Sequence, residues 1–179
     1  MAALFPERRR RSPSMHSMRF QSLAKTLSFD PTSDVFRLST SPFYLIAHAD
    51  FMYHDAMERT LDKHGITKST YRILTVLRES QPCSVTYLAD TALIKRTTVS
   101  RIVDRMVQMS LVTTNQGGED GRVTEVKMTE EGRALLDKLT PMIARLIQRA
   151  TEGLTHAELT RLVATLQIIS SNLSRSPIE

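Results

Sequence analysis

Residues 94–106 read IKRTTVSRIVDRM, a stretch that combines an apolar stripe with a crowded polar face. Val99, Ile102, Val103 and Met106 recur at the spacing of one face of an α-helix. The opposite side carries three arginines, one lysine, two threonines and one serine. A helix of this kind suits either a solvated surface or contact with an anionic partner. The flanking sequence has to distinguish these two interpretations.

The composition limits the class of protein and the class of partner. The chain has 179 residues, with 24 Lys and Arg against 19 Asp and Glu, and its net charge of +5 favours acidic partners such as nucleic acid. The single cysteine, Cys83, excludes an intramolecular disulfide and suits a reducing compartment. No apolar run approaches the roughly 18 residues of a membrane span, and none resembles the core of a signal peptide. We therefore expect a soluble, cytoplasmic protein without a membrane partner.

Capping residues divide the chain before the quoted stretch into three expected helices. A serine followed by proline is a favourable helix start, and a glycine favours a helix end. These signals predict a long helix from Ser41 and Pro42 to Gly65, a shorter one from Thr67 to before Pro82, and a third from Ser84 to Ala92. The quoted stretch follows the third helix after a very tight turn.

After residue 109 the pattern changes to two β-branched runs around a glycine-rich segment. The runs LVTT and RVTEVKMT, separated by NQGGEDG, predict a β-hairpin. A helix restarts at TEEGRALLDKL and should bend at Pro141, and a last helix starts at a capping box of Thr155 and Glu158. The first and last helices are too long and apolar to be covered by the middle of the chain. We therefore expect them to pair with a second copy.

Two short helices joined by a tight turn, the second one basic at its start, are typical of a helix-turn-helix. The second helix of such a unit enters the major groove, where arginine reaches guanine and hydroxyl groups reach bases or phosphates. Lys95 and Arg96 would meet a phosphate at the positive end of the helix dipole. In the alternative interpretation, Asp104 pairs with Arg101 and Arg105 on an ordinary solvated surface.

The predicted hairpin favours the DNA interpretation. Asp120 lies two residues before Arg122 in its turn, where it can hold the arginine in one pose. An arginine presented at the edge of a hairpin suits the narrow minor groove, which has a deep negative potential. A solvated turn is the alternative.

Together these parts resemble the MarR family of winged helix-turn-helix regulators. The resemblance runs from Ile66 to Leu136, through ITKSTYRIL, SVTYLADTALIKRTTVSRIVDRM and EDGRVTEVKMTEEGRALL. It implies a homodimer formed by the first and last helices, with recognition helices in successive major grooves and wings in flanking minor grooves. It also implies that small ligands, often aromatic acids, bind between the dimerisation helices and the DNA-binding lobe and release the operator.

The resemblance also assigns roles to individual residues. It implies DNA contacts by Arg96, Thr97, Thr98, Ser100, Arg101 and Arg122, with Asp120 orienting Arg122. Lys95 and Arg105 join the expected DNA-binding set through their own position on the outward face of the helix and at its start.

Three features depart from the family's pattern. Leu93 takes a turn position that is usually glycine, Lys95 replaces a small polar or acidic cap, and TTNQGG lacks the basic residues common before the wing. We expect a strained or reshaped turn at Leu93. We expect Lys95 to contact a phosphate instead of capping the helix. We expect Arg122 to contribute a larger share of the wing's DNA binding.

A second stripe on the first long helix is a candidate effector site. Tyr44, His48, Phe51 and Asp55 mix aromatic and ionisable side chains, which suits a small aromatic acid. Arg72, in the next helix, would pair with the carboxylate of such an acid through two hydrogen bonds. A dimer interface, in which aromatic residues are also frequent, is the alternative.

The remaining reactive side chains indicate no further site. Cys83 lies in QPCSV, where a small apolar residue would pack ahead of the Ser84 cap, so a buried inert thiol is favoured over a redox sensor. The five histidines have no metal-ligand spacing. No catalytic or cofactor-binding motif is present, and we expect neither an enzyme nor a bound cofactor.

The sequence therefore predicts a mainly α protein with a small β-hairpin wing, in which a winged helix-turn-helix is flanked by long N- and C-terminal dimerisation helices. The expected parts are a disordered arm (1–34), a dimerisation helix (35–65), a DNA-binding lobe (66–128), C-terminal dimerisation helices (129–174) and a tail (175–179).

The expected function is that of a homodimeric transcriptional repressor. It would bind double-stranded DNA at a pseudo-palindromic operator, with half-sites centred ~10 bp apart, and a small effector such as an aromatic acid would release it. Two alternatives stay open: a thiol-based redox-sensing regulator acting through Cys83, and a winged-helix protein-interaction module without an operator.

Overall fold

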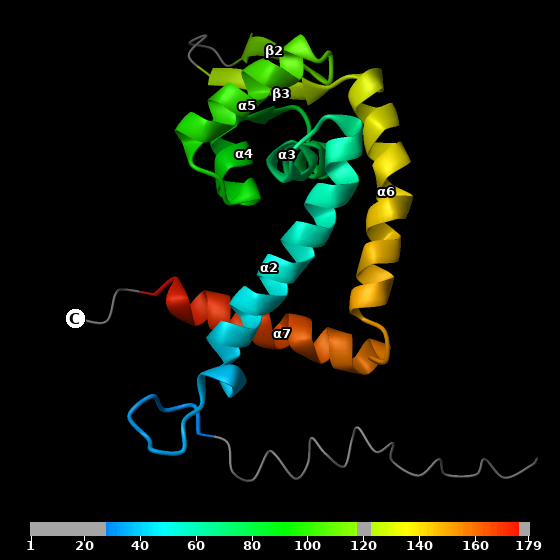
Figure 1. Cartoon of the computed structure of the whole chain (residues 1–179). Helices are drawn as coiled ribbons and strands as arrows, with labels where there is room; N and C mark the ends of the chain where they lie inside the picture. The colour runs from blue at the N-terminus through cyan, green and yellow to red at the C-terminus, as the bar shows by residue number, and fades with distance from the viewer. Residues whose placement is uncertain (1–27, 118–122, 176–179) are drawn as a thin grey trace, which may run out of the picture. The chain divides into compact units, whose positions relative to one another are not determined.

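The computed structural model describes residues 28–117 and 123–175. It divides the chain into two compact units, one ending at Met52 and the other beginning at Tyr53. The elements follow the predicted order (Figure 1): η1 Leu38–Thr40, α2 Pro42–Leu61, η2 Asp62–His64, α3 Lys68–Glu79, β1 Cys83–Ser84, α4 Val85–Ala92, α5 Arg96–Gln108, β2 Val112–Gly117, β3 Val123–Met128, α6 Glu130–Ala150 and α7 His156–Leu173. Of the expected N-terminal arm, residues 1–27 lie outside the described residues.

The predicted capping residues begin the helices. The hydroxyl groups of Thr67 and Ser84 accept hydrogen bonds from the backbone N–H groups of Thr70 and Tyr87, at 3.2 and 3.1 Å. Each bond satisfies one of the N–H groups that a helix leaves unpaired at its start. The reciprocal pair at the start of α7 is the predicted capping box of Thr155 and Glu158.

The predicted hairpin is part of a three-stranded antiparallel sheet with the strand order β1-β3-β2. Strands β2 and β3 pair from Val112 opposite Met128 to Gly117 opposite Val123. The two-residue strand β1 pairs with the other edge of β3, Cys83 lying opposite Val126. Strand β1 was not predicted from the sequence, because two residues are too few to show a strand's alternation.

Helices α3, α4, α5 and α6 pack with this sheet around one hydrophobic core, all within the unit that begins at Tyr53. The stripe predicted on residues 94–106 belongs to that core: Val99, Val103 and Met106 are 0%, 2% and 0% exposed, and Ile102 is half-buried. Its burial fixes which side of α5 faces outward. We call residues 53–150 of this unit the lobe.

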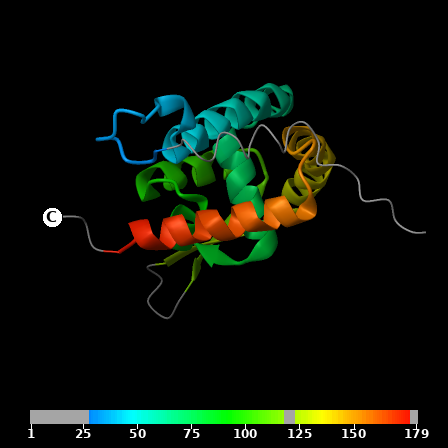
Figure 2. The same ribbon diagram turned by 90° about the horizontal axis from the view of Figure 1, so that it is seen from below.

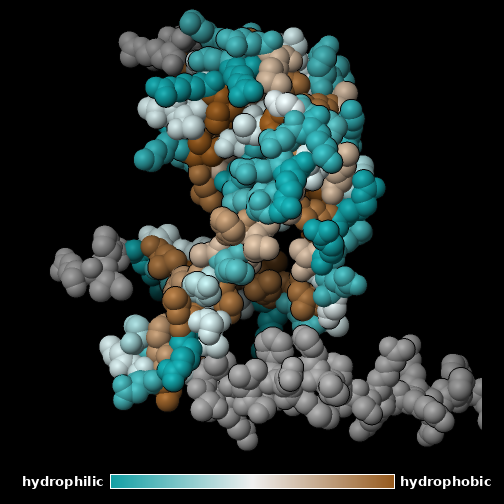
Figure 3. Space-filling view, in the orientation of Figure 1, coloured by the Kyte–Doolittle hydropathy of each residue, from teal (hydrophilic) through white to brown (hydrophobic). Residues whose placement is uncertain are grey.

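Helix α7 follows the lobe at the C-terminal end of α6. Helix α6 continues through Pro141. Helix α7 runs at a steep angle to α6: in Figure 2, α6 is viewed nearly along its axis and α7 from the side. No side chain of α7 is buried. Apolar side chains also reach the surface elsewhere (Figure 3), and the exposed large ones on α2, α6 and α7 are Phe43, Tyr44, Leu45, Ile46, Phe51, Met52, Ile147, Leu162, Val163, Ile168 and Leu173. None of the described helices is long and apolar enough to cross a membrane.

Candidate nucleic-acid interface

The outward face of α5 carries the predicted polar set. Seven of the predicted DNA-binding residues are exposed on this helix or at its N-cap, Arg105 being in its last turn: Lys95, Arg96, Thr97, Thr98, Ser100, Arg101 and Arg105. Their exposure follows from helical phase, since the core holds the opposite side of the same helix. The structure therefore gathers these residues on one face.

The cations of this face have no acidic partner among the described residues. No ion pair forms between Asp104 and Arg101 or Arg105, in contrast to the ion pairs recorded elsewhere, such as Arg133 with Glu130. The ion pairs that the alternative interpretation expected are therefore absent among the described residues, while an ordinary solvated face stays an alternative. Uncompensated cations raise the local potential and attract anions.

A shallow hollow adjoins the start of α5. Its volume is about 200 Å³, and residues from β1, α4, α5 and β3 line it: Ser84, Val85, Thr86, Arg96, Ser100, Val123 and Thr124. One guanidinium and several hydroxyl groups thus face one small space near the beginnings of two helices. This is the donor chemistry that phosphate oxygens accept. Thr86 and Thr124 were not predicted from the sequence, because they come together only through the pairing of β1 with β3.

The turn before α5 shows both predicted departures. Leu93 adopts the left-handed conformation, with φ 53° and ψ 47°, and its side chain is 84% exposed. This conformation costs a residue with a side chain about 1–2 kcal/mol relative to glycine. Lys95 is the N-cap of α5 and makes no capping hydrogen bond. The start of α5 is therefore both strained and uncapped.

Lys95→Ser should stabilise the fold and weaken DNA binding. A serine cap adds about 0.5–2 kcal/mol to the free energy of unfolding, which urea titration measures. Removal of the cation should lower the slope of log affinity against log salt by about 0.9 if Lys95 contacts a phosphate. Lys95→Ala is the matched control, since it loses the charge without gaining a cap. Equal stability of the serine and alanine variants would contradict the capping argument.

The predicted wing tip lies outside the described residues. Strand β2 is described up to Gly117 and β3 from Val123, whereas Asp120 and Arg122 fall between them. The pairing of Gly117 with Val123 shows that a hairpin connects the strands. The role of Arg122 stays a prediction.

A second pocket is lined by residues from the C-terminal part of α2 and from α3. Its volume is about 260 Å³, and it is lined by Tyr53, Met57, Lys68, Tyr71, Arg72, Thr75, Val76 and Glu79. We call it the α3 pocket. Burial raises the pKa of Tyr53, Tyr71 raises it further, and Arg72 lowers it. Two phenol rings and a guanidinium thus share one partly buried space.

The α3 pocket contains one of the four predicted effector residues. Arg72 lines it, whereas Tyr44, His48 and Phe51 belong to the unit that ends at Met52. In that unit the rings of Tyr44 and His48 stack with centroids 6.0 Å apart, and Phe51 is 69% exposed. An effector role for these three residues stays a prediction. Tyr53 and Tyr71 were missed because their spacing also fits a helix's core-facing stripe.

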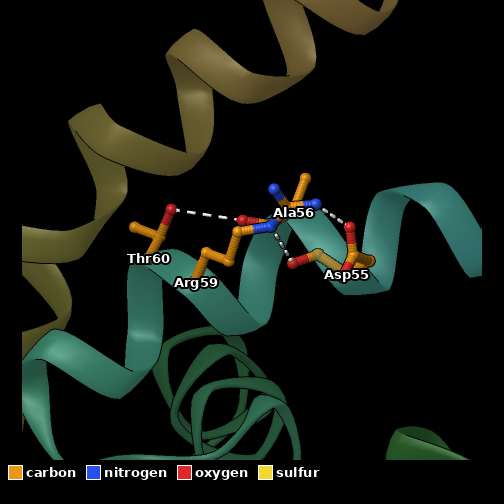
Figure 4. Close-up of polar contacts among 4 residues, drawn as sticks. All are labelled: Asp55, Ala56, Arg59 and Thr60. Carbon is orange, nitrogen blue, oxygen red and sulfur yellow. Dashed lines mark hydrogen bonds and ion pairs between the residues drawn. The ribbon is translucent and has the colours of Figure 1, made fainter.

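Asp55, the last member of the predicted stripe, is engaged on its own helix. Its carboxylate forms an ion pair with Arg59, one turn further along α2 (Figure 4). Pairs of this spacing stabilise a helix by about 0.2–0.5 kcal/mol. Asp55 is therefore explained as part of a surface ion pair.

Arg72 also reaches the helix-turn-helix. Its Nη1 donates a hydrogen bond to the backbone carbonyl of Ala92, the last residue of α4, at 2.9 Å. One side chain thus lines the α3 pocket and contacts the end of the helix before the strained turn.

Cys83 lies in β1 and is half-buried. Burial raises the pKa of its thiol, which lowers the fraction of reactive thiolate. This direction favours the predicted inert thiol over a redox sensor. Within the described ranges, no group of His, Cys, Asp and Glu side chains is arranged to hold a metal ion.

Comparisons with known proteins agree with this architecture. A family model described as MarR family matches residues 64–123. The chain is 37% identical over 144 residues to the HTH-type transcriptional repressor IacR of Pseudomonas putida, a match that covers 80% of this chain and 86% of IacR.

Two solved structures share the fold. One is BpsR of Bordetella bronchiseptica, whose DNA binding is regulated by 6-hydroxynicotinic acid, with a TM-score of 0.69, 24% identity, and coverage of 75% of this chain and 96% of that one. The other is CouR of Rhodococcus jostii RHA1 bound to p-coumaroyl-CoA, with a TM-score of 0.69, 23% identity, and coverage of 80% and 99%.

Proposed function

The chain belongs to the MarR family of transcriptional regulators, and on this premise we propose that it is a homodimeric repressor released from a pseudo-palindromic operator by a small aromatic acid. One observation carries the proposal. The second helix of the helix-turn-helix exposes Arg96, Arg101 and Arg105 without acidic partners among the described residues.

We propose that α5 lies in the major groove. Arg101 would bridge the O6 and N7 atoms of a guanine, and Thr97 and Ser100 would reach base edges or phosphates. The hollow beside Arg96 suits a backbone phosphate, which Thr86 and Thr124 would contact from two further elements. Phosphate contacts set the register, while the contacts of Arg101 select the sequence.

The dimer rests on the uncovered helices. Leu162, Val163 and Ile168 on α7 are exposed, as are Phe43 and Ile46 on α2. Helices with such apolar faces gain stability by pairing, and a two-fold symmetric dimer presents two copies of α5 to two half-sites. The resemblance to the MarR family implies the same arrangement.

The effector proposal rests on the α3 pocket. Tyr53 and Tyr71 offer aromatic walls, and Arg72 and Lys68 offer cationic groups for a carboxylate. The ligands of BpsR and CouR, 6-hydroxynicotinic acid and p-coumaroyl-CoA, both carry a ring. An aromatic ring is the feature that the two ligands share, and the cationic side of the pocket leads us to propose a small aromatic acid, as in BpsR.

Aromatic carboxylates should lower the protein's affinity for its operator. Coupling between an effector and a second ligand is typically 5- to 150-fold, or about 1–3 kcal/mol. Fluorescence anisotropy with a labelled operator and 6-hydroxynicotinic acid as the probe measures it. The matched control is 6-hydroxynicotinamide, which has the ring but no carboxylate. Equal release by acid and amide would show that the cationic groups do not select the ligand.

The experiment that tests the DNA-binding proposal compares two duplexes of equal length. One comes from the region upstream of the protein's own gene, and the other is its scrambled sequence. At moderate salt, specific affinities exceed non-specific ones by about 10³ or more. Equal affinity for several upstream segments and their scrambled versions would instead support a protein-interaction module.

A further inference from the structure

The side chain of Arg72 joins two features that are separate in the sequence. It lines the α3 pocket, and its Nη1 lies 2.9 Å from the carbonyl oxygen of Ala92. The two residues are 20 positions apart and belong to α3 and α4. The guanidinium that donates to Ala92 is therefore also the cationic group that an anion in the pocket would meet, so the two can compete for it.

The carbonyl of Ala92 lies at a sensitive point. It ends α4, where the helix dipole is negative and a cation is favourable. In the part of the chain that the structure describes, no backbone N–H donates to it, whereas the N–H groups of Leu93 and Ile94 turn back to carbonyls within α4. Arg72 is therefore the group that caps this carbonyl.

The next residue, Leu93, is the one that carries the strain of the turn. Its backbone is left-handed, with φ 53°, a conformation that costs glycine little energy but strains a leucine. Such a conformation persists only where its surroundings hold it. The side chain of Leu93 is 84% exposed, so contacts of the backbone on either side of the turn, and not side-chain packing, stabilise this conformation.

We propose that Arg72 is a positioning residue for DNA binding. Its hydrogen bond to Ala92 fixes the end of α4, and thereby the turn that determines the position of α5. An anion bound in the α3 pocket breaks this hydrogen bond. The inference rests on the proposed function, because it assigns a regulatory role within the same protein. A carboxylate binds the guanidinium through two charge-assisted hydrogen bonds, each roughly twice as strong as a hydrogen bond to a neutral carbonyl such as that of Ala92. Ala92 then loses its donor, and the strained turn before Lys95 is free to relax.

A double-mutant cycle on operator affinity, measured without any effector, tests the positioning role. Arg72→Ala should lower affinity about tenfold, since a charged hydrogen bond is lost at the turn. Leu93→Gly alone should change affinity by less than about twofold. In the double variant, glycine adopts the turn without strain, so most of the tenfold loss should be recovered. Arg78→Ala, an exposed arginine on the same helix, is the control and should bind like the wild type.

A further variant separates positioning from mere folding. Arg72→Lys keeps a cationic donor that can reach the carbonyl and should restore affinity to within about threefold of wild type. The variant Arg72→Ala with Leu93→Gly should bind the operator but respond at least about tenfold less to 6-hydroxynicotinic acid.

Three results would overturn the proposal. The first is an operator affinity of Arg72→Ala equal to that of the wild type. The second is a loss of affinity in the double variant equal to the sum of the two single losses. The third is a double variant that 6-hydroxynicotinic acid releases from DNA as well as it releases the wild type. Any of them leaves the proposed function intact provided that the wild type binds its operator and the acid releases it. Failure of the wild type to prefer an operator over scrambled DNA is a different result, which overturns the proposed function itself.

Discussion

Arg101→Ala should lower operator affinity by about 5- to 150-fold, because a bidentate contact between arginine and guanine contributes about 1–3 kcal/mol of discrimination. The side chain is exposed on α5 and has no acidic partner among the described residues, so its removal disrupts no ion pair there. Affinity for scrambled DNA should fall much less, since the lost contact reads a base. Fluorescence anisotropy with operator and scrambled duplexes measures both effects.

Arg145→Ala provides the matched control for this variant. Arg145 is an exposed arginine on α6, outside the helix-turn-helix, and its removal changes the net charge by the same amount. We expect its operator affinity to stay within about twofold of wild type, apart from the weak long-range effect of charge. If Arg101→Ala and Arg145→Ala bind alike, α5 does not read the operator through Arg101.

Gly132→Ala should destabilise the fold by about 1–3 kcal/mol or more, the range for an extra methyl group forced into a packed site. A Cβ at this position would lie 2.2 Å from the backbone oxygen of Leu111 and 2.9 Å from the side chain of Met128. That oxygen already accepts a hydrogen bond from the N–H of Thr129, so it cannot move away freely. The free energy of unfolding in urea measures the loss.

Lys138→Ala is the comparison for the glycine variant. Lys138 is exposed on the same helix, and alanine is a good helix former, so stability should stay within about 0.5 kcal/mol. If Gly132→Ala is as stable as Lys138→Ala, the close contact between the start of α6 and Leu111 is not a constraint on the fold. Steric exclusion of a side chain would then not explain the glycine at position 132.

The fold of the lobe follows largely from local signals. The phase of Val99, Val103 and Met106 predicted which side of α5 is buried, and the caps at Thr67 and Ser84 predicted two helix starts. Both signals act within a few residues, over which sequence periodicity and hydrogen-bonding side chains are directly readable. They were sufficient to place the basic face.

The features that were missed depend on contacts between distant segments. Strand β1 exists because Cys83 pairs with Val126, and the hollow with Thr86 and Thr124 exists because of that pairing. Likewise, the bond from Arg72 to Ala92 joins positions that no local pattern relates. Tertiary pairing of this kind is not encoded in the periodicity of either segment alone.

Two local rules are broken at the start of α5, and both breaks concern the proposed function. Lys95 occupies a position where a capping residue would stabilise the helix, and Leu93 occupies one where glycine would relieve strain. Departures from local preference are expected at functional sites. In the proposed function, the lost stability accompanies a cation that would face DNA and a turn that an effector would relax.

Selection of bound sequences from a pool of random duplexes tests the central claim most directly, because it needs no prior choice of operator. The account predicts enrichment of a pseudo-palindrome with half-site centres ~10 bp apart, bound by two chains per duplex. Arg101→Ala should select a site with relaxed preference at one base pair in each half. A wild-type protein that enriches no sequence over the starting pool would contradict the account.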